Sequence, residues 1–188
     1  AILVNQQGER FVNEMETRDT VSAAINALDE GYAYLIFDAG VKDRVKAVNT
    51  YIEKGFVQSD ETIEALAGQL EMDGAILAQT LTSWNETVAS QVDGAFNRTT
   101  ALNNPLAAAP YYAIQIAPGI HHTMGGLKIN ANAQVISTEG TVIDGLYAAG
   151  EVTGGVHGSN RIGGNAVADI IVFGRQAGIQ SASYVQAK

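Results

Sequence analysis

The chain has 188 residues, of which 46% are apolar and 16% are charged, and its formal net charge is −9. This length suits one domain, or one with an attached subdomain, and the composition and acidic balance exclude a disordered chain and a general nucleic-acid binder. Because the sequence has no cysteine, it can form no disulfide, thiolate zinc site or c-type haem attachment, and no apolar run is long enough for a membrane span.

The first hundred residues are predicted to be mostly helical after a short hairpin made by AILVN and RFVNE. A helix is expected to begin at Thr17 or Asp19 and to end at Gly31. The apolar stretch YAYLIFD reads as a buried strand, and VKDRVKAVNTYIEKG as one amphipathic helix that ends at Gly55.

Two further helices are predicted before the composition changes. Ser59 is expected to cap a helix over SDETIEALAGQL, with Asp60 and Glu61 in its first turn, where the helix dipole favours acids. Asp73 is expected to open another helix, which has an apolar stripe at helical spacing: Leu77, Leu81, Trp84 and Val88.

The predicted secondary structure changes from mainly helices to mainly strands near Pro105. Strands are predicted over YYAIQIA, over HHTMGGLKIN and AQVIS with a turn at Asn132, and within TVIDGLYAAGEV. A last helix is predicted from Asn165 to Ser183, directly after a glycine-rich loop. The fold class is therefore α/β or α+β, with a helical stretch over about 19–100 and the chemistry over about 105–188.

The glycine-rich loop lies within GEVTGGVHGSNRIGGNAVADIIVFG, residues 150–174. Glycine clusters mark special backbone angles or a close approach of main chain to a partner. A loop that feeds a helix also gathers free N–H groups and the positive end of the helix dipole at one point, which suits a phosphate, a carboxylate or an electron-rich ring edge. The loop is neither a Walker A motif nor a G-x-G-x-x-G fingerprint, and a long turn between strand and helix is an equally good interpretation of the spacing alone.

Candidate cations lie in three segments of the sequence. Arg161 lies directly before the last helix, and a guanidinium can grip a carboxylate through two parallel hydrogen bonds. His121 and His122 are adjacent, and Arg18 lies in METRDT. Each could equally be an ordinary surface or core residue. The three histidines of the chain lack the i, i+4 spacing of a helical metal site, which is therefore weakly supported.

Four motifs together carry a resemblance that spans nearly the whole chain. They resemble the flavoprotein portion of the bacterial flavocytochrome c fumarate reductases and relatives such as urocanate reductase: RFVNEMETRDT, PGIHHTMGG, GLYAAGEVTGGVHGSNRIGGNA and ADIIVFGRQAG. The resemblance implies the C-terminal part of an FAD-binding domain, after the capping domain. It also implies reduction of the C=C bond of an unsaturated acid, fumarate before urocanate, by hydride from flavin N5.

The resemblance also implies roles for single residues. Arg18 would be the acid that protonates the substrate, and His122 and Arg161 would bind its carboxylate. Residues expected at the FAD are Glu151, Asn165, Ala166 and Val167. A sodium ion would be held, largely by main-chain oxygens, at Thr123, Met124, Gly125, Glu151 and Thr153.

Further expectations concern the rest of the protein. The chain begins within an apolar run, so we expect a piece of a longer protein whose upstream segments supply the FAD fingerprint, the cap and c-type haem. An electron-donating cytochrome as partner and the periplasm as location follow from the resemblance alone. Two alternatives stay open: a folded, non-catalytic piece that needs its upstream half to bind FAD, and a flavin oxidase or dehydrogenase acting on amino acids or ketosteroids.

Overall fold

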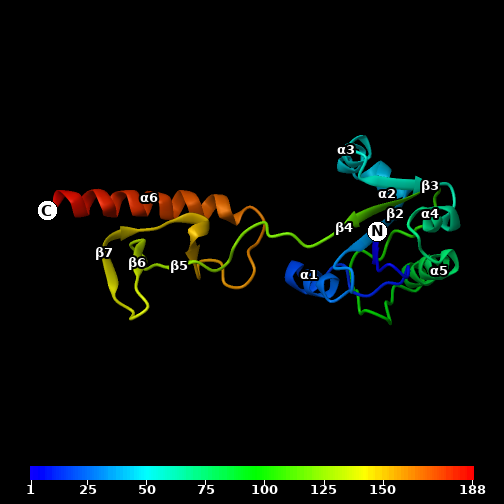
Figure 1. Ribbon diagram of the computed structural model, residues 1–188, viewed down its shortest axis with the longest axis horizontal. Coiled ribbons are helices and arrows are strands. Elements are labelled where there is room, and N and C mark those ends of the chain that lie inside the picture. Colours follow the sequence, from blue (N-terminus) through cyan, green and yellow to red (C-terminus); the bar gives the residue numbers. More distant parts are fainter. The chain divides into compact units, whose positions relative to one another are not determined.

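A four-stranded antiparallel sheet organises the first part of the chain. The computed structural model describes residues 1–188, which divide into two units, Ala1–Pro118 and Gly119–Lys188. In the first unit the strands lie in the order β1-β2-β4-β3 (Figure 1). Their bounds are Ile2–Val4 for β1, Ala33–Asp38 for β2, Val57–Asp60 for β3 and Tyr111–Ile116 for β4. The first unit extends to Pro118 because β4 pairs with both β2 and β3.

One face of this sheet is covered by α4 (Ile63–Gln69) and α5 (Gly74–Ser90). Side chains of a strand alternate between the two faces, so every second residue of β1 and β2 reaches this layer. The buried cluster joins strand residues Ile2, Val4, Tyr34 and Ile36 to helix residues Leu66, Leu77, Leu81 and Trp84. This layer is the main core of the first unit.

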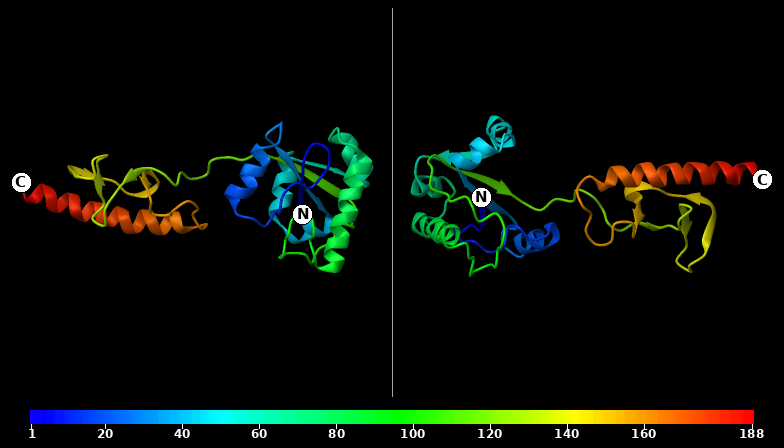
Figure 2. Two further views of the ribbon diagram at one scale, coloured as in Figure 1. Left: turned by 90° about the horizontal axis from the view of Figure 1, so that it is seen from below. Right: turned by 180° about the vertical axis from the view of Figure 1, so that it is seen from behind.

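The opposite face is covered by α1 (Arg18–Asn26) and α3 (Ala47–Glu53). Leu3 packs with Ile25 of α1, and Val48 of α3 packs with Phe37. Phe37 also stacks on Tyr112, with ring centroids 5.2 Å apart. The two views of Figure 2 show helices on both sides of the strands, so the expected mixed α/β class is confirmed.

The prediction for α5 is confirmed. The carboxylate of Asp73 accepts hydrogen bonds from the N–H groups of Ala75 and Ile76, which caps the helix. Leu77, Leu81 and Trp84 are buried, and Val88, the last residue of the stripe, packs against the same cluster. The predicted strands YAYLIFD and YYAIQIA are also present, as β2 and β4.

Two predicted helices are wrong in detail. The single helix expected to end at Gly55 is two helices, α2 (Ala39–Arg44) and α3, because Val45 adopts an extended conformation between them. The break allows Val48 to pack on Phe37. The helix expected to begin at Ser59 begins at Ile63, with Thr62 as its N-cap. Residues 57–60 instead form β3, since the edge of β4 offers them backbone partners.

The ends of two other predicted elements also differ. Thr17 precedes α1 as expected, but the helix ends at Asn26, before Gly31. The expected hairpin between AILVN and RFVNE is reduced to one bridge between Val4 and Arg10, and β1 pairs with β2. None of the helices combines the length and apolar content needed to cross a bilayer.

The second unit consists of short strands and one long helix, α6 (Asn165–Gln186), which confirms the predicted last helix. β6 (Gln134–Ile136) and β7 (Val142–Tyr147) are antiparallel. β5 (Leu127–Lys128) pairs in parallel with β8 (Thr153–Gly154), just after the 3-10 helix η1 (Gly150–Val152). The strand expected over HHTMGGLKIN is therefore much shorter. It meets AQVIS through the bridge between Ile129 and Val135 and through hydrogen bonds between Asn130 and Gln134.

Much of the apolar surface of α6 is uncovered within the second unit. Val167, Ile170, Ile171 and Val172 expose 58%, 53%, 63% and 60% of their surface. The buried apolar residues of the second unit are small in comparison: Ala133, Val135 and Ala148. A large exposed apolar patch is typical of a surface that packs against further polypeptide or a ligand.

Candidate functional site

The glycine-rich loop ends at an uncapped helix. Gly164 occupies the N-cap position of α6 with φ of +87°, a conformation that favours glycine, and it supplies no capping side chain. The first turn is Asn165, Ala166 and Val167, the residues predicted to lie at the flavin. The N–H groups of Asn165 and Val167 donate to the carbonyls of Ile162 and Gly164 at 3.2 Å and 3.0 Å. What this helix start offers an electron-rich partner is therefore mainly the positive end of the helix dipole, and a contact of these residues with the flavin stays a prediction.

Arg161 is a buried cation without an acidic partner. The residue exposes only 7% of its surface, and its Nη1 donates to the carbonyl of Ile162 at 3.2 Å. Its Nε is buried and has no acceptor, and no carboxylate forms an ion pair with it. A buried charge is costly unless it is paired. The site is therefore suited to an anion that the second unit does not provide.

His122 is held by two neighbours. Its Nδ1 lies 3.6 Å from Oε2 of Glu151, and its ring packs edge to face against the ring of His157, with centroids 5.6 Å apart. The His122 side chain is 7% exposed, whereas the adjacent His121 is an exposed residue. No hydrogen bond or ring contact joins His122 to Arg161. The structure thus places both predicted ligands of the substrate in the second unit, without direct contact between them.

Glu151 links the loop of His122 to η1. Its Oε1 accepts a hydrogen bond from the N–H of Thr123 at 2.9 Å. This hydrogen bond, aided by the nearby His122, lowers the pKa of Glu151 from its ordinary value of 4.5, against a smaller opposing effect of desolvation. The carboxylate is thus kept ionised beside His122.

A further pair was missed by sequence reasoning. Nε2 of His157 lies 3.1 Å from Oδ2 of Asp169, and the Asp169 side chain is 2% exposed. The signal was present in the sequence, because Asp169 is the one acidic residue of α6 and sits beside Ile170 and Ile171. An acid among apolar residues of a helix indicates a specific partner.

The segments predicted to hold sodium lie together. Thr123 contacts Glu151 through its N–H and its hydroxyl, and the pairing of β5 with β8 brings residues 127 and 153 side by side. The Thr153 hydroxyl donates to the carbonyl of Gly150 at 2.7 Å. No group of three or more His, Cys, Asp or Glu side chains is arranged to hold a metal. A sodium site at Thr123, Met124, Gly125, Glu151 and Thr153 stays a prediction.

Two glycines allow the main chains of these segments to meet. A Cβ on Gly126 would lie 2.3 Å from the carbonyl oxygen of Val152, and one on Gly154 would lie 2.5 Å from the N of Gly126. No real side chain fits at such distances. At these two positions the absence of a side chain allows the two main chains to pack directly against each other. A Cβ on Gly155, Gly158 or Gly164, in contrast, would meet nothing within 4 Å.

Arg18 belongs to the first unit. It is the first residue of α1, it is exposed, and its side chain has no hydrogen-bond or ion-pair partner in the chain. Since His122 and Arg161 belong to the second unit, the expected convergence of the three cations around one cavity stays a prediction.

The segment before Arg18 is anchored by a buried ionic network. The Glu14 carboxylate binds both Arg10 and Arg98, with nitrogen–oxygen distances of 2.9 Å and 3.0 Å. Both guanidinium groups lie over the ring of Trp84, and Arg10 also binds Asp93 at 2.9 Å. Burial acts to raise the pKa of Asp93, but the hydrogen bonds from Arg10 and the Phe96 N–H outweigh it and lower that pKa.

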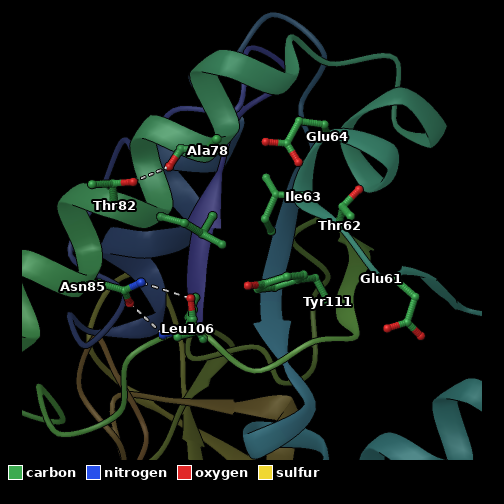
Figure 3. Close-up of a pocket in the computed structure, with 11 residues that line it drawn as sticks. Glu61, Thr62, Ile63, Glu64, Ala78, Thr82, Asn85, Leu106 and Tyr111 are labelled. Atoms are coloured by element: carbon green, nitrogen blue, oxygen red, sulfur yellow. Dashed lines mark hydrogen bonds between the residues drawn. The ribbon is translucent and has the colours of Figure 1, made fainter.

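A hollow of about 400 Å³ in the first unit is not the predicted site. Figure 3 shows Glu61 and Glu64 at its rim, with Tyr111 beside Ile63, and Asn85 bonded to Leu106. None of the predicted site residues lines it, and it presents two acids and no basic side chain. Two carboxylates repel an anionic substrate, so the hollow does not suit an unsaturated acid.

Comparison with known proteins shows the family of the chain. Residues 1–167 match the family described as FAD binding domain. The chain is 57% identical over 182 residues to an NADH:fumarate oxidoreductase of Klebsiella pneumoniae, covering 97% of this chain and 20% of that protein. It is 48% identical over 184 residues to a fumarate reductase (cytochrome) of Shewanella frigidimarina, covering 98% of this chain and 32% of that protein.

A solved structure gives the same result. The open conformation of a flavocytochrome c3 fumarate reductase matches with a TM-score of 0.81 and 46% identity, over 98% of this chain and 32% of that chain. The chain thus spans between a fifth and a third of the length of these proteins. It belongs to the FAD-binding domain family of flavoproteins, and the relatives that it resembles within that family are fumarate reductases.

Proposed function

We propose that the protein containing this chain uses FAD to reduce the C=C bond of an unsaturated carboxylic acid, with fumarate as the first candidate. The observation that carries the proposal is Arg161, a buried guanidinium with an orphaned Nε and no acid of its own. A carboxylate substrate would supply the missing charge and acceptor. The similarity to fumarate reductases supports the same chemistry.

FAD, when bound, would supply a hydride to one alkene carbon, and residues of this chain would bind the acid and protonate the other carbon. Arg161 and His122 bind the substrate carboxylate and orient the double bond. Arg18 donates a proton to the other alkene carbon. An arginine normally keeps its proton, so this step requires a strongly basic carbon in the transition state and a relay that reprotonates the guanidinium.

FAD binding is proposed to need more polypeptide than this chain. The uncapped first turn of α6, with Asn165, Ala166 and Val167, would face the ring, and Glu151 would lie near it. The apolar residues exposed on α6 support a shared site, since burying them against the remaining protein would be favourable. A cytochrome donor with c-type haem, a periplasmic location and a bound sodium ion are further proposals that rest on the resemblance.

The test of this function compares two arginines in the intact FAD-loaded protein. Arg161→Lys keeps a positive charge but loses the planar fork that binds both carboxylate oxygens. We expect the kcat/KM for fumarate to fall by about 100-fold or more, with the flavin content unchanged. Arg175→Lys, on the exposed surface of the same helix, is the matched control. Equal kcat/KM in the two variants would remove Arg161 from substrate binding.

Two measurements decide between the alternatives. Urocanate and fumarate are compared as oxidants of the reduced enzyme, because urocanate offers one carboxylate and an imidazole where fumarate offers two carboxylates. The 188-residue chain is also mixed with FAD while its absorbance band is followed. We expect weak or no binding by the chain alone and a flavin-loaded protein once the remaining segments are present. A loaded protein that reduces neither acid would favour the non-catalytic alternative.

A further inference from the structure

One hydrogen bond joins the two ends of the loop that carries Arg161. His157 precedes this loop and Asp169 follows it on α6, twelve positions further along the chain. Nε2 of His157 lies 3.1 Å from Oδ2 of Asp169, and the two side chains are 13% and 2% exposed. An ionised carboxylate only accepts hydrogen bonds, so Nε2 of His157 is the donor. The contact closes the chain from residue 157 to residue 169 into a ring.

The loop inside this ring has little packing of its own. Among residues 158–164, Arg161 is the one buried residue, and three of the seven are glycines. A Cβ on Gly158 or Gly164 would meet nothing within 4 Å, and Ile162 is 76% exposed. Glycine has more backbone freedom to lose on ordering than any other residue. A contact that pins both ends of the loop therefore narrows the range of positions open to Arg161.

The direction of the Arg161 guanidinium depends on the same loop. Its Nη1 donates to the carbonyl of Ile162, the next residue of the loop, at 3.2 Å. Its Nε is buried and has no acceptor. Because the guanidinium is bonded to the main chain of its own loop, a shift of that main chain also turns the guanidinium.

Packing does not explain the acid at position 169. Oδ1 of Asp169 is buried without a hydrogen-bond partner, and Ala168 and Ile170 flank it on α6. A buried carboxylate with an unsatisfied oxygen lowers stability relative to an apolar residue of similar size. An apolar side chain would therefore fill this place at lower cost, whereas only an acceptor can hold His157.

We infer that His157 and Asp169 are positioning residues, whose hydrogen bond holds the loop of Arg161 and so directs its guanidinium toward the substrate carboxylate. The inference rests on the proposed function, because it needs Arg161 to bind that carboxylate. In this inference neither His157 nor Asp169 touches the substrate. Their effect on the reaction passes through Arg161 alone, and that property separates it from a general contribution to folding.

Two substitutions of His157 separate its hydrogen bond from its ring. His157→Gln keeps a donor to Asp169 and loses the ring, whereas His157→Phe keeps a ring and loses the donor. The edge-to-face contact with His122 is thus lost in the first variant and retained in the second. In the intact FAD-loaded protein we expect the kcat/KM for fumarate to stay within about threefold of wild type in His157→Gln and to fall about tenfold in His157→Phe. Equal values, or the reverse order, would overturn the inference.

A double-mutant cycle with Arg161→Lys tests whether the effect passes through Arg161. We expect Arg161→Lys to lower kcat/KM by about 100-fold. The double variant with His157→Phe should match Arg161→Lys within about threefold, because the planar guanidinium that the loop directs is gone. Gln176→Ala is the matched control, since it removes a hydrogen bond from α6 to Asn132 outside the loop. It should leave kcat/KM unchanged, and flavin content and thermal midpoint are measured for every variant.

The outcomes separate the inference from the proposed function. If the losses of Arg161→Lys and His157→Phe multiply in the double variant, or if His157→Phe costs nothing, the inference is overturned and the proposed function stands. If Arg161→Lys costs nothing, binding of the carboxylate by Arg161 falls, and the inference falls with it.

A pair of variants at position 169 carries the test if His157→Phe does not retain its flavin. Asp169→Asn keeps an oxygen that accepts the hydrogen bond from His157, whereas Asp169→Leu has a similar volume and no acceptor. We expect Asp169→Asn to stay within about threefold of the wild-type kcat/KM and Asp169→Leu to lose about tenfold, both per bound flavin. Equal activity of the two variants would show that the hydrogen bond positions nothing.

Discussion

Arg10 and Glu14 are joined by two parallel hydrogen bonds, Nε to Oε1 at 2.9 Å and Nη2 to Oε2 at 3.0 Å. The same carboxylate binds Arg98 at 3.0 Å. One acid therefore holds two buried cations together, and it lies four residues before Arg18.

Loss of Glu14 should destabilise the first unit strongly. Glu14→Gln leaves two buried guanidinium groups without their shared charge, and removing one partner of a buried ion pair costs about 3–5 kcal/mol. Trp84 lies beneath both guanidinium groups and is the one tryptophan of the chain, so its fluorescence during urea unfolding reports on the network directly. Glu16→Gln, an exposed residue nearby, should change the free energy of unfolding by less than about 0.5 kcal/mol. Equal midpoints for the two variants would contradict this account.

The pKa of Asp93 predicts a loss of stability in acid. Because the folded pKa lies below the ordinary 3.8, ionised Asp93 stabilises the fold above that pH, and the contribution disappears as the pH falls through the folded pKa. Asp93→Asn should lower the free energy of unfolding by about 1.5–3 kcal/mol near pH 6. The gap between wild type and variant should begin to narrow as the pH falls below the ordinary pKa of 3.8 and should close once the pH lies below the folded pKa. Urea unfolding at several pH values checks this, and a gap independent of pH would refute it.

A methyl group on Gly126 should disrupt the second unit. In Gly126→Ala the added carbon meets the Val152 carbonyl at 2.3 Å, so β5 and β8 must separate. Forced shifts of this kind cost about 1–3 kcal/mol. Gly119→Ala is the control, since nothing lies within 4 Å of its added carbon. The thermal midpoint of the intact protein should fall in the first variant and stay within error in the second.

Arg18 should be needed for proton transfer and not for flavin binding. In the intact protein, Arg18→Ala is expected to keep its FAD while fumarate reduction slows by about 10²–10⁴-fold, the range for loss of a positioned acid. Flavin reduction by dithionite should proceed as in the wild type, because that half of the cycle needs no proton donor to the substrate. Arg44→Ala, another exposed arginine of the first unit, is the control. Turnover retained in Arg18→Ala would exclude it as the acid.

The parts of the fold that the sequence predicts well are those whose signals are local. α5 has a capping carboxylate at Asp73 and a regular stripe, and both signals agree. The start of α4 was misplaced because Ser59 and Thr62 are both good caps, and the choice between them depends on β4, which lies far along the chain and pairs with residues 57–60. The break at Val45 likewise depends on tertiary packing, because Val48 packs against Phe37 of β2.

In the candidate site, too, local features could be predicted from the sequence and tertiary contacts could not. The glycine loop and Arg161 could be found from residue type and position, and the structure adds that Arg161 is buried and unpaired. The pairing of His157 with Asp169 could not be found in that way, because twelve residues separate them and only the turn into α6 brings them together. Contacts made across a loop depend on backbone geometry that composition does not encode.

Gly126 and Gly154 lie against each other, so main-chain atoms alone set the separation of the two loops that contain them. One of these loops carries His122 and the other leads to Arg161. Replacement of side chains elsewhere in either loop therefore leaves their separation unchanged. Side chains exposed on either loop can therefore be exchanged without a change in the main-chain contact that holds the two loops together.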